Sequence, residues 1–328
     1  MAFKTAPREH SAPRENTIDW SEYDKYVEAS AGLQEVDTLP GYIAAIVDLG
    51  IQKQEDAAEV FEGSAEDEAK IISKYPDTYF EDGKDKNGNP ARLKRYPRKA
   101  QQAVVLAVEF PDIIIDKGQF FGESNPQPLR MWLGGKFNID KKNYISHPAM
   151  LNIVNLNRQN RSLPKVWSLA ANSLLYKMAV ADKLVKPGQA FMPENIDQLL
   201  GKTMQFQVQI KREPSKKDAS KVYLKESIKF ASGLARGQVA YEPKHSFIIE
   251  FDGENPAEYV KQLPEHVRNT IKLASNYHSS KIKRQLGDDS PAPQEEKKEP
   301  NAPVRVVTPA VSEPIIGNAD AGDDDSPF

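Results

Sequence analysis

Apolar side chains recur at every second position in several stretches of this chain of 328 residues. A period of two predicts β-strands, because successive side chains of a strand point to opposite faces of the sheet. In residues 39–51 the predicted inward-facing set is Ile43, Ala45, Val47, Leu49 and Ile51. The same pattern predicts strands over residues 101–110, 129–137, 199–212 and 221–230, and residues 112–116 form a short β-branched segment.

Four other stretches have the spacing of helices. They are a short amphipathic segment at 20–29, an acidic segment at 55–75, a long segment at 149–186 interrupted near Pro164, and a helical pair at 256–286. The long segment has the most continuous apolar face, which consists of Val166, Leu169, Ala170, Ser173, Leu174, Lys177, Met178 and Ala181. A turn cluster at 83–90 separates the acidic segment from the next basic run.

The coarse order is three strands, a helix and two strands, which is the order of the OB-fold, a five-stranded Greek-key barrel that binds oligonucleotides. We therefore expect a mainly β, α+β fold: an OB-fold-like barrel with an acidic helical insertion after its first strand and additional C-terminal helices. Residues 18–286 would form this domain. A Pro- and charge-rich arm at 1–17 and a tail at 287–328 are expected to be disordered.

Composition narrows the possible chemistry. Hydrophobic residues make up 39% of the chain and charged residues 28%, and there are no cysteines and only five histidines. Disulfides, iron–sulfur clusters, thiolate zinc sites and cysteine nucleophiles are thereby excluded. No apolar run approaches the ~20 residues of a transmembrane helix, and the N-terminal residues are polar. We expect a cytoplasmic protein with no membrane contact, no cofactor and no metal.

Charge is distributed unevenly along the chain. Residues 287–328 contain 10 acidic and 3 basic residues, a net charge of −7, and subtracting them from the 47 acidic and 44 basic residues of the whole chain leaves +4 for residues 1–286. A basic body with an acidic tail is typical of nucleic-acid binding or of an interaction tail.

The last six residues carry the most specific signal, and they are Asp323, Asp324, Asp325, Ser326, Pro327 and Phe328. This tip resembles that of bacterial single-stranded DNA-binding proteins, which ends in three aspartates, an apolar residue, proline and phenylalanine; Ser326 departs from that pattern. A terminal phenylalanine supplies an apolar anchor beside its own carboxylate, and the aspartates attract basic residues around a partner's pocket. A purely solubilising tail would explain the aspartates but not the terminal aromatic ring.

The body resembles more closely the single-stranded DNA-binding proteins of tailed bacteriophages, which also join an OB-fold to an acidic tail with a C-terminal aromatic residue. The resemblance implies binding of single-stranded DNA in the host bacterial cytoplasm. It also implies recruitment of replication and recombination proteins, such as a polymerase, a helicase-primase or a nuclease, through Asp323, Asp324, Asp325, Pro327 and Phe328. A homodimer is one candidate assembly.

The best candidate DNA surface is the polar face of residues 203–230. It alternates with an apolar face and consists of Gln205, Gln207, Gln209, Lys211, Lys221, Tyr223, Lys225 and Lys229. Lysines neutralise phosphates and an exposed tyrosine ring stacks on a base, but an ordinary solvated sheet face has the same pattern.

Three further groups are candidates for DNA contact. The first is the basic run Arg92, Lys94, Arg95, Tyr96, Arg98 and Lys99; the second is Arg130, Trp132 and Lys136, at the spacing of one strand face; the third is Arg158 and Arg161 in a polar stretch. A solvated loop and a buried tryptophan are the competing interpretations of the first two groups.

Enzyme motifs are not found. Gly201-Lys202-Thr203 resembles the end of a phosphate-binding loop, but Ile196 stands where its first glycine is required. The sequence thus predicts a non-catalytic single-stranded DNA-binding protein. The alternatives are a recombination mediator or strand-annealing protein and, in a different class, a metal-dependent nuclease that uses Glu109, Asp112 and Asp116.

Overall fold

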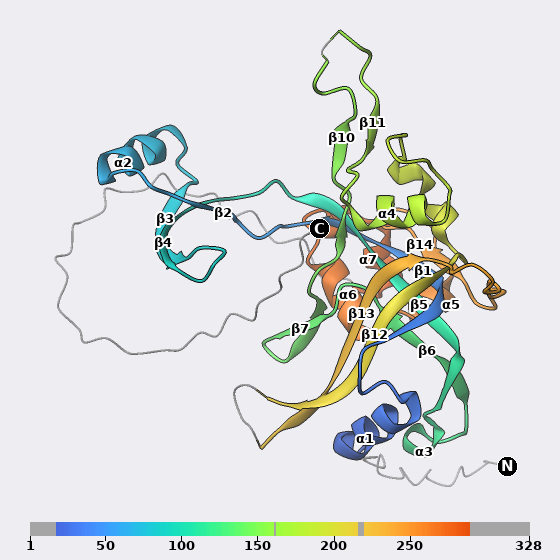
Figure 1. Ribbon diagram of the computed structural model, residues 1–328. Coiled ribbons are helices and arrows are strands. Elements are labelled where there is room, and N and C mark those ends of the chain that lie inside the picture. The colour runs from blue at the N-terminus through green and yellow to red at the C-terminus, as the bar shows by residue number, and fades with distance from the viewer. Residues whose placement is uncertain (1–17, 161, 216–219, 289–328) are drawn as a thin grey trace, which may run out of the picture. The chain divides into compact units, whose positions relative to one another are not determined.

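The computed structural model describes residues 18–160, 162–215 and 220–288. They form a mixed α+β fold in which almost all strand pairs are antiparallel and the helices are short (Figure 1). Within these residues, no helix combines the length and the apolar character needed to cross a bilayer. The predicted arm at 1–17, Arg161 and the five residues of the predicted docking tip lie outside the described residues.

The main sheet contains the five predicted strands. They are β1 (Asp37–Gln52), β5 (Gln101–Asp116), β6 (Pro126–Trp132), β12 (Thr203–Pro214) and β13 (Val222–Gly233). Their order in the sheet is β13-β12-β1-β5-β6, and β14 (Phe247–Ile249) adds to β1 in parallel while β9 (Ala149–Met150) pairs with β5. β6 and β13 end the path without pairing with each other, so a closed barrel is not formed by the described strand pairs.

β1 is central because it pairs on both edges. Its first half pairs with β12 and its second half with β5, with a register shift between Ile43 and Ala45. Its two faces are covered by two different apolar clusters, with Ile43 in one and Ala45 in the other, so Ile43, Ala44 and Ala45 are all fully buried. The predicted single inward-facing set is therefore incomplete, and Ile51 at the end of the strand is exposed.

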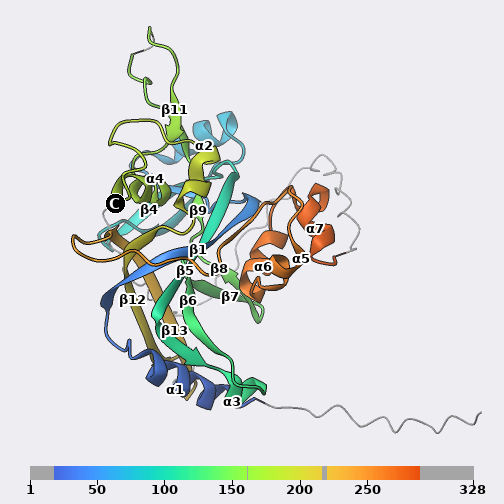
Figure 2. The ribbon, with the colours of Figure 1, turned by 90° about the vertical axis from the view of Figure 1, so that its right-hand side faces the viewer.

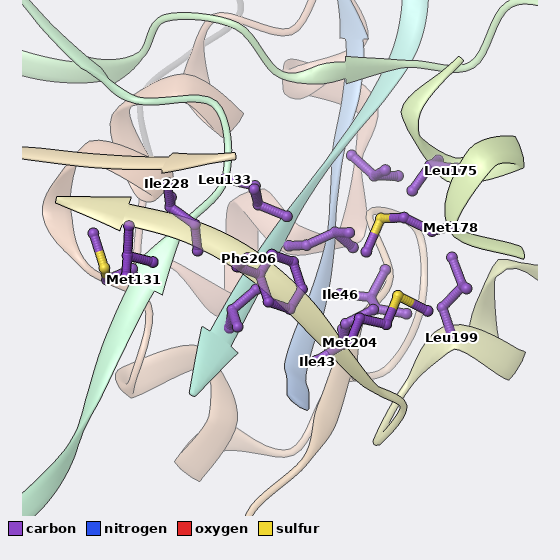
Figure 3. Packing of buried hydrophobic residues seen from close by; sticks show 14 of the residues in the cluster. Ile43, Ile46, Met131, Leu133, Leu175, Met178, Leu199, Met204, Phe206 and Ile228 are labelled. Carbon is purple, nitrogen blue, oxygen red and sulfur yellow. The ribbon is translucent and has the colours of Figure 1, made fainter. Parts of the chain in front are cut away.

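Two apolar clusters lie on opposite faces of this sheet. The first joins β1, β6, β12 and β13 to α4 (Leu174–Ala181) and the 3-10 helix η1 (Pro193–Leu199); Figure 3 shows Ile43, Phe206 and Met178 converging in it. The second cluster joins the other face of β1 and β5 to the C-terminal helices α5 (Ala257–Lys261), α6 (Glu265–Lys272) and α7 (Lys281–Gln285), with η2 (Tyr277–Ser279) between the last two. Figure 2 shows these helices on one side of β1, β5 and β6, with β12 and β13 on the other.

The predicted N-terminal helix is confirmed as α1 (Trp20–Ala31). The Asp19 side chain accepts hydrogen bonds from the first free backbone N–H groups, and Gly32 ends the helix with φ of 66°, a left-handed conformation that glycine adopts readily. Its buried residue Val27 joins the first apolar cluster. Glu28 binds Arg212 of β12 at 2.6 Å, which fixes the helix against the strand pair.

The acidic insertion is a small domain-like arm between β1 and β5. It contains a sheet in the order β2-β4-β3, formed by β2 (Ala57–Val60), β3 (Tyr79–Lys84) and β4 (Pro90–Tyr96), together with α2 (Ala65–Lys74). The prediction of one helix over 55–75 is thus correct only for its second half. The chain leaves β1 for the arm after Gln52 and enters β5 from the arm at Gln101. These two residues lie opposite each other in the main sheet, so the arm begins and ends at the same place.

The prediction of a mainly helical segment at 149–186 is wrong. Only α4 is helical there, and the segment also contains β9 and a projecting hairpin formed by β10 (Ile153–Asn155) and β11 (Trp167–Leu169) (Figure 1). Asn155 holds the hairpin loop by accepting hydrogen bonds from the backbone N–H groups of Asn157 and Val166. These side-chain bonds to the backbone compete with helix formation, which is why helical spacing of the apolar residues misleads here.

Two strand boundaries also differ from the prediction. Residues 112–116 continue β5 past a register shift, and the strand predicted at 129–137 ends at Trp132. Gly134 and Gly135 then adopt φ of 107° and 65° and turn the chain into a second small hairpin, β7 (Lys136–Ile139) and β8 (Lys142–Ile145). Further on, β5 is followed by the single turn α3 (Gly118–Phe121), and the predicted C-terminal helical pair is the series α5 to α7.

Candidate nucleic-acid interface

The outer face of the β12–β13 pair brings together most of the predicted hairpin residues. Antiparallel register places Gln207 opposite Lys229, Lys211 opposite Lys225, and Glu213 opposite Tyr223. Partners that lie directly opposite share one face of a sheet, so these six side chains form a ladder on it. We call this ladder, completed by Gln209 opposite Ser227, the lysine face.

The opposite face of the same two strands is closed by packing. Phe206, Val208 and Ile210 are buried in the first apolar cluster. At the far end of the pair Asp24 of α1 accepts a hydrogen bond from the backbone N–H of Leu224, at 3.3 Å. The alternation of apolar and polar residues along these two strands therefore gives one face buried in the core and one face exposed to solvent.

Positive charge exceeds negative charge on the lysine face. Glu213 lies between two lysines, with Lys211 Nζ at 2.6 Å and Lys225 Nζ at 3.2 Å, and its hydrogen bond from Lys211 is the main cause of its lowered pKa. Lys229 is exposed and has no ion-pair partner among the described residues. One carboxylate therefore compensates for three ammonium groups, and the face attracts a polyanion.

Tyr223 supplies the aromatic component of the lysine face. It is 44% exposed at the end of the ladder, next to Lys225 on the same strand face. An exposed ring flanked by ammonium groups can stack on a base while the lysines contact the neighbouring phosphates. Lys221 lies at the start of β13 and is exposed, at the border of the described residues.

Two of the predicted glutamines do not offer a free amide to a ligand. Gln205 is only 5% exposed and donates a hydrogen bond to Gln238, so its prediction as a surface residue is wrong. It is buried because the chain after β13 returns over the beginning of β12, where Tyr241 donates its backbone N–H to Thr203. Gln209 donates its amide to the carbonyl oxygen of Gln34, which lies along the edge of β12.

The basic run at 92–99 is largely neutralised within the arm. It forms β4, the middle strand of the arm's sheet, and its neighbours supply the acids. Arg92 binds Glu68 at 2.8 Å and Asp82 at 3.0 Å; Arg95 binds Glu81 at 2.8 Å. Lys94 lies 3.5 Å from Glu59, which also accepts the hydroxyl hydrogen bond of Tyr96 at 2.7 Å.

Only the end of this run stays available. Arg98 and Lys99 are exposed and have no ion-pair partner among the described residues. The predicted rim of six contact residues is thereby reduced to two, at the base of the arm where the chain enters β5.

The group Arg130, Trp132 and Lys136 is not an exposed platform. Trp132 is 9% exposed and its ring packs edge-on against His266 of α6, so the outward orientation predicted for it is wrong. Arg130 is bound at 2.8 Å to Glu109, a buried carboxylate that also accepts the hydroxyl hydrogen bond of Tyr42. Burial, together with that bond, raises the pKa of Tyr42 to about 12.

The gap between the unpaired edges of β6 and β13 is bridged just beyond the end of β6, where Lys136 of β7 binds Glu226 of β13 at 2.5 Å. The gap itself is a cavity of about 450 Å³ whose lining includes Glu109, Arg130 and Glu226. Within this lining Glu109 and Arg130 bind each other, and Glu226 binds Lys136.

The third predicted group lies on the β10–β11 hairpin. Arg158 is exposed in the hairpin loop, and Arg161 is outside the described residues. The prediction missed Trp167 of the same hairpin, which is 48% exposed. The helical interpretation placed this residue off the analysed face, although a tryptophan within a run of amides and cations was a signal present in the sequence.

The three acids considered for a nuclease are engaged separately. Glu109 holds Arg130, Asp112 accepts the hydroxyl hydrogen bond of Tyr241, and Asp116 accepts backbone hydrogen bonds from Gly118 and Asn125, both at 2.9 Å. Across the described ranges, no group of three or more histidine, aspartate or glutamate side chains is arranged to hold a metal ion. The geometry therefore provides no support for metal-dependent cleavage by these residues.

Comparison of the chain with protein-family models, with curated proteins and with solved structures yields no match.

Proposed function

We propose that this protein binds single-stranded DNA without sequence preference and serves phage DNA replication, recombination or repair. The observation that carries the proposal is the lysine face, where three lysines and an exposed tyrosine share one open face of a strand pair. Lysines give affinity through release of counterions from phosphates, and a ring stacks on any base, so neither contact depends on sequence.

The order of the main sheet supports an OB-fold-like barrel as the scaffold. In sequence order β1, β5, β6, β12 and β13 take the places of the five barrel strands, with α4 between the third and the fourth. A barrel of this kind would be partly open between β6 and β13, where Lys136 and Glu226 make the link. The fold thus favours oligonucleotide binding only by analogy with other barrels of this kind. The lysine face supplies the side chains that would contact the phosphates and bases.

Recruitment of partners is the second part of the proposal. The tip residues Asp323, Asp324, Asp325, Pro327 and Phe328 would dock on replication or recombination proteins in the host bacterial cytoplasm. The tail is best removed after Asp288, because this residue accepts a hydrogen bond from Tyr277 at 2.9 Å and belongs to the body. Loss of residues 289–328 should abolish recruitment and leave DNA binding equal or stronger, since a tethered polyanion no longer competes.

The test is a titration of fluorescently labelled oligonucleotides followed by anisotropy. Single-stranded dT30 should bind more tightly than duplex of the same length, and the affinity should fall steeply with salt. Tyr223→Ala should weaken binding by ~1–3 kcal/mol if the ring stacks on a base. Tyr79→Ala is the matched control, because Tyr79 is also 44% exposed but belongs to β3, in the separate sheet of the arm.

Equal affinity for duplex and single strand, or affinity unchanged between low and moderate salt, would contradict the proposal. Equal effects of the two tyrosine variants would remove Tyr223 from the interface while leaving the lysines to be tested.

A further inference from the structure

The β10–β11 hairpin lies within the longest acid-free segment of the body. Residues 141–181 contain no aspartate or glutamate, although 47 of the 328 residues of the chain are acidic, about one in seven. The same segment contains six cations, and they are Lys141, Lys142, Arg158, Arg161, Lys165 and Lys177. A segment of this kind offers no carboxylate of its own to neutralise its cations, whereas the arm supplies acids to its basic run from its other strands and from α2.

The hairpin combines a buried base with an exposed outer part. Ser168 and Leu169 are fully buried, and Leu169 donates its backbone N–H to the carbonyl of Phe191 at 2.8 Å. Beyond this anchor Leu163 and Trp167 are 49% and 48% exposed. A rigid base and an exposed indole make the hairpin suited to contact a ligand outside the body of the protein.

Trp167 and a cation share one face of the hairpin. The backbone N–H of Leu156 donates to the carbonyl of Val166 at 2.8 Å, so the two chains remain paired beyond the strand ends. Lys165 comes two residues before Trp167, which is the spacing that puts side chains on one side of an extended chain. Lys165 is exposed and has no ion-pair partner among the described residues, and the loop adds the exposed Arg158.

We infer that the β10–β11 hairpin is a second contact surface for single-stranded nucleic acid, in which Trp167 stacks on a base and Lys165 and Arg158 neutralise phosphates. The polyanion is chosen over a protein partner because the segment lacks acids altogether, whereas an apolar protein contact would not require that. The inference builds on the proposed function and extends it, since the lysine face belongs to different strands. A single-stranded DNA molecule that binds both the lysine face and the hairpin must be long enough to span the distance between them.

The first experiment uses the fluorescence of tryptophan. The chain has three tryptophans, of which Trp132 is buried and Trp20 is 60% exposed on α1. In a Trp20→Phe protein, Trp167 is the single exposed indole of the described residues, and stacking on a base should quench its emission when dT30 is added. The Trp20→Phe, Trp167→Phe double variant should show no such quenching. Equal quenching in both proteins would overturn the inference.

The second experiment measures affinity for dT30. Trp167→Ala should weaken binding about fivefold or more, the fold-change expected for one lost base–aromatic stack. Leu163→Ala is the matched control, because it removes an equally exposed apolar side chain from the same hairpin without removing a ring. Circular dichroism and thermal unfolding establish that both variants are folded, and Trp167→Phe should retain part of the affinity.

The outcomes separate this inference from the proposed function. If the unaltered protein does not bind dT30, the proposed function itself fails. If it binds and Tyr223→Ala weakens binding while Trp167→Ala does not, only the second surface is refuted. Loss of a protein partner from Trp167→Ala at unchanged dT30 affinity would also refute it and would assign the hairpin to protein docking.

Discussion

The two sides of the main sheet differ in what covers them. On one side, α5 to α7 pack on β1 and β5 and bury Ala103, Val105 and Ala107 under a second apolar cluster. On the other side, β12 and β13 cover the first cluster and turn their own outer face to solvent, with Lys225, Lys229 and Tyr223 on it. Both sides belong to one sheet, yet only the second presents charge and an exposed ring.

The comparison shows that strand order does not by itself locate a binding face. Oligonucleotide-binding barrels commonly use the face of their second and third strands, which here correspond to β5 and β6 in the proposed scaffold. That face is occupied by the C-terminal helices, and its tryptophan is a core residue. The exposed, positively charged surface lies on the last two strands of the main sheet, β12 and β13, instead.

The largest expected effect is on the covered side. Trp132→Ala removes a large buried ring from between the sheet and α6, and truncations of this kind cost ~3–5 kcal/mol of unfolding free energy. Chemical denaturation should show this loss, and any protein that remains folded should bind dT30 as before. A stable variant with weakened DNA affinity would show that Trp132 contacts DNA and that the side we describe as covered is the binding side.

Substitutions on the lysine face should change the affinity for DNA rather than the free energy of unfolding. Lys225→Gln with Lys229→Gln removes two ammonium groups from the lysine face, and binding of dT30 should fall roughly tenfold at low salt. The plot of log affinity against log salt should flatten by about 1.4, at about 0.7 for each lost phosphate contact.

The matched control for this pair is Lys84→Gln with Lys86→Gln, which removes the same charge from exposed lysines of the arm. Similar losses in both double variants would mean that net charge, not the lysine face, sets the affinity.

Acidification should act through the covered side. His266 is buried beside Trp132, and its Nε2 has no hydrogen-bond partner within the described part of the chain. Burial is the main cause that lowers its pKa to about 4; nearby Lys136 lowers it further and Glu226 opposes the change. The unfolded chain binds this proton near pH 6.5, so the native state loses stability as the pH falls from about 6.5 towards 4.

Between pH 7 and pH 5 this group should reduce the unfolding free energy by about 2 kcal/mol. Denaturation at the two pH values measures the difference, and His266→Leu should reduce it, since leucine does not titrate. An unchanged pH dependence in His266→Leu would assign the effect to other groups.

The smallest effect on DNA binding is expected in the arm. Arg92→Ala with Arg95→Ala removes two guanidinium groups that already bind Glu68, Asp82 and Glu81. We expect affinity for dT30 to stay near that of the unaltered protein, while the arm becomes more sensitive to limited proteolysis. A marked fall in affinity would show that these ion pairs open on binding.

Much of the main sheet could be predicted from the alternation of apolar and polar residues. Residues 203–210 show why, because Met204, Phe206, Val208 and Ile210 are all buried and Gln207 between them is exposed. Local pattern sufficed there since one face of the strand pair meets the core and the other meets water. It failed for β1, where both faces are covered and alternation carries no information about orientation.

The candidate site was harder to predict, because residues distant in the sequence decide whether a basic side chain is paired with an acid or left exposed. From Lys86 to Lys99 the sequence has no acid, but strand pairing and α2 bring Glu59, Glu68 and Glu81 to the run. Lys229, by contrast, is opposite Gln207 and stays exposed. The number of basic residues in the sequence pointed to both the basic run at 92–99 and the lysine face. Only the strand register and the packing of α2 show that the first is paired with acids and the second is exposed.

The close pairing of Gln52 with Gln101 has a consequence for how the chain can be rebuilt. Because the arm starts and ends at adjacent positions of one antiparallel pair, β1 and β5 would form an ordinary hairpin if residues 53–100 were replaced by a short turn. Loop-closure entropy changes only slowly with length, so inserts of different length should cost the sheet little stability there. We therefore expect the arm to be exchangeable, and this position to accept a foreign domain grafted onto the scaffold.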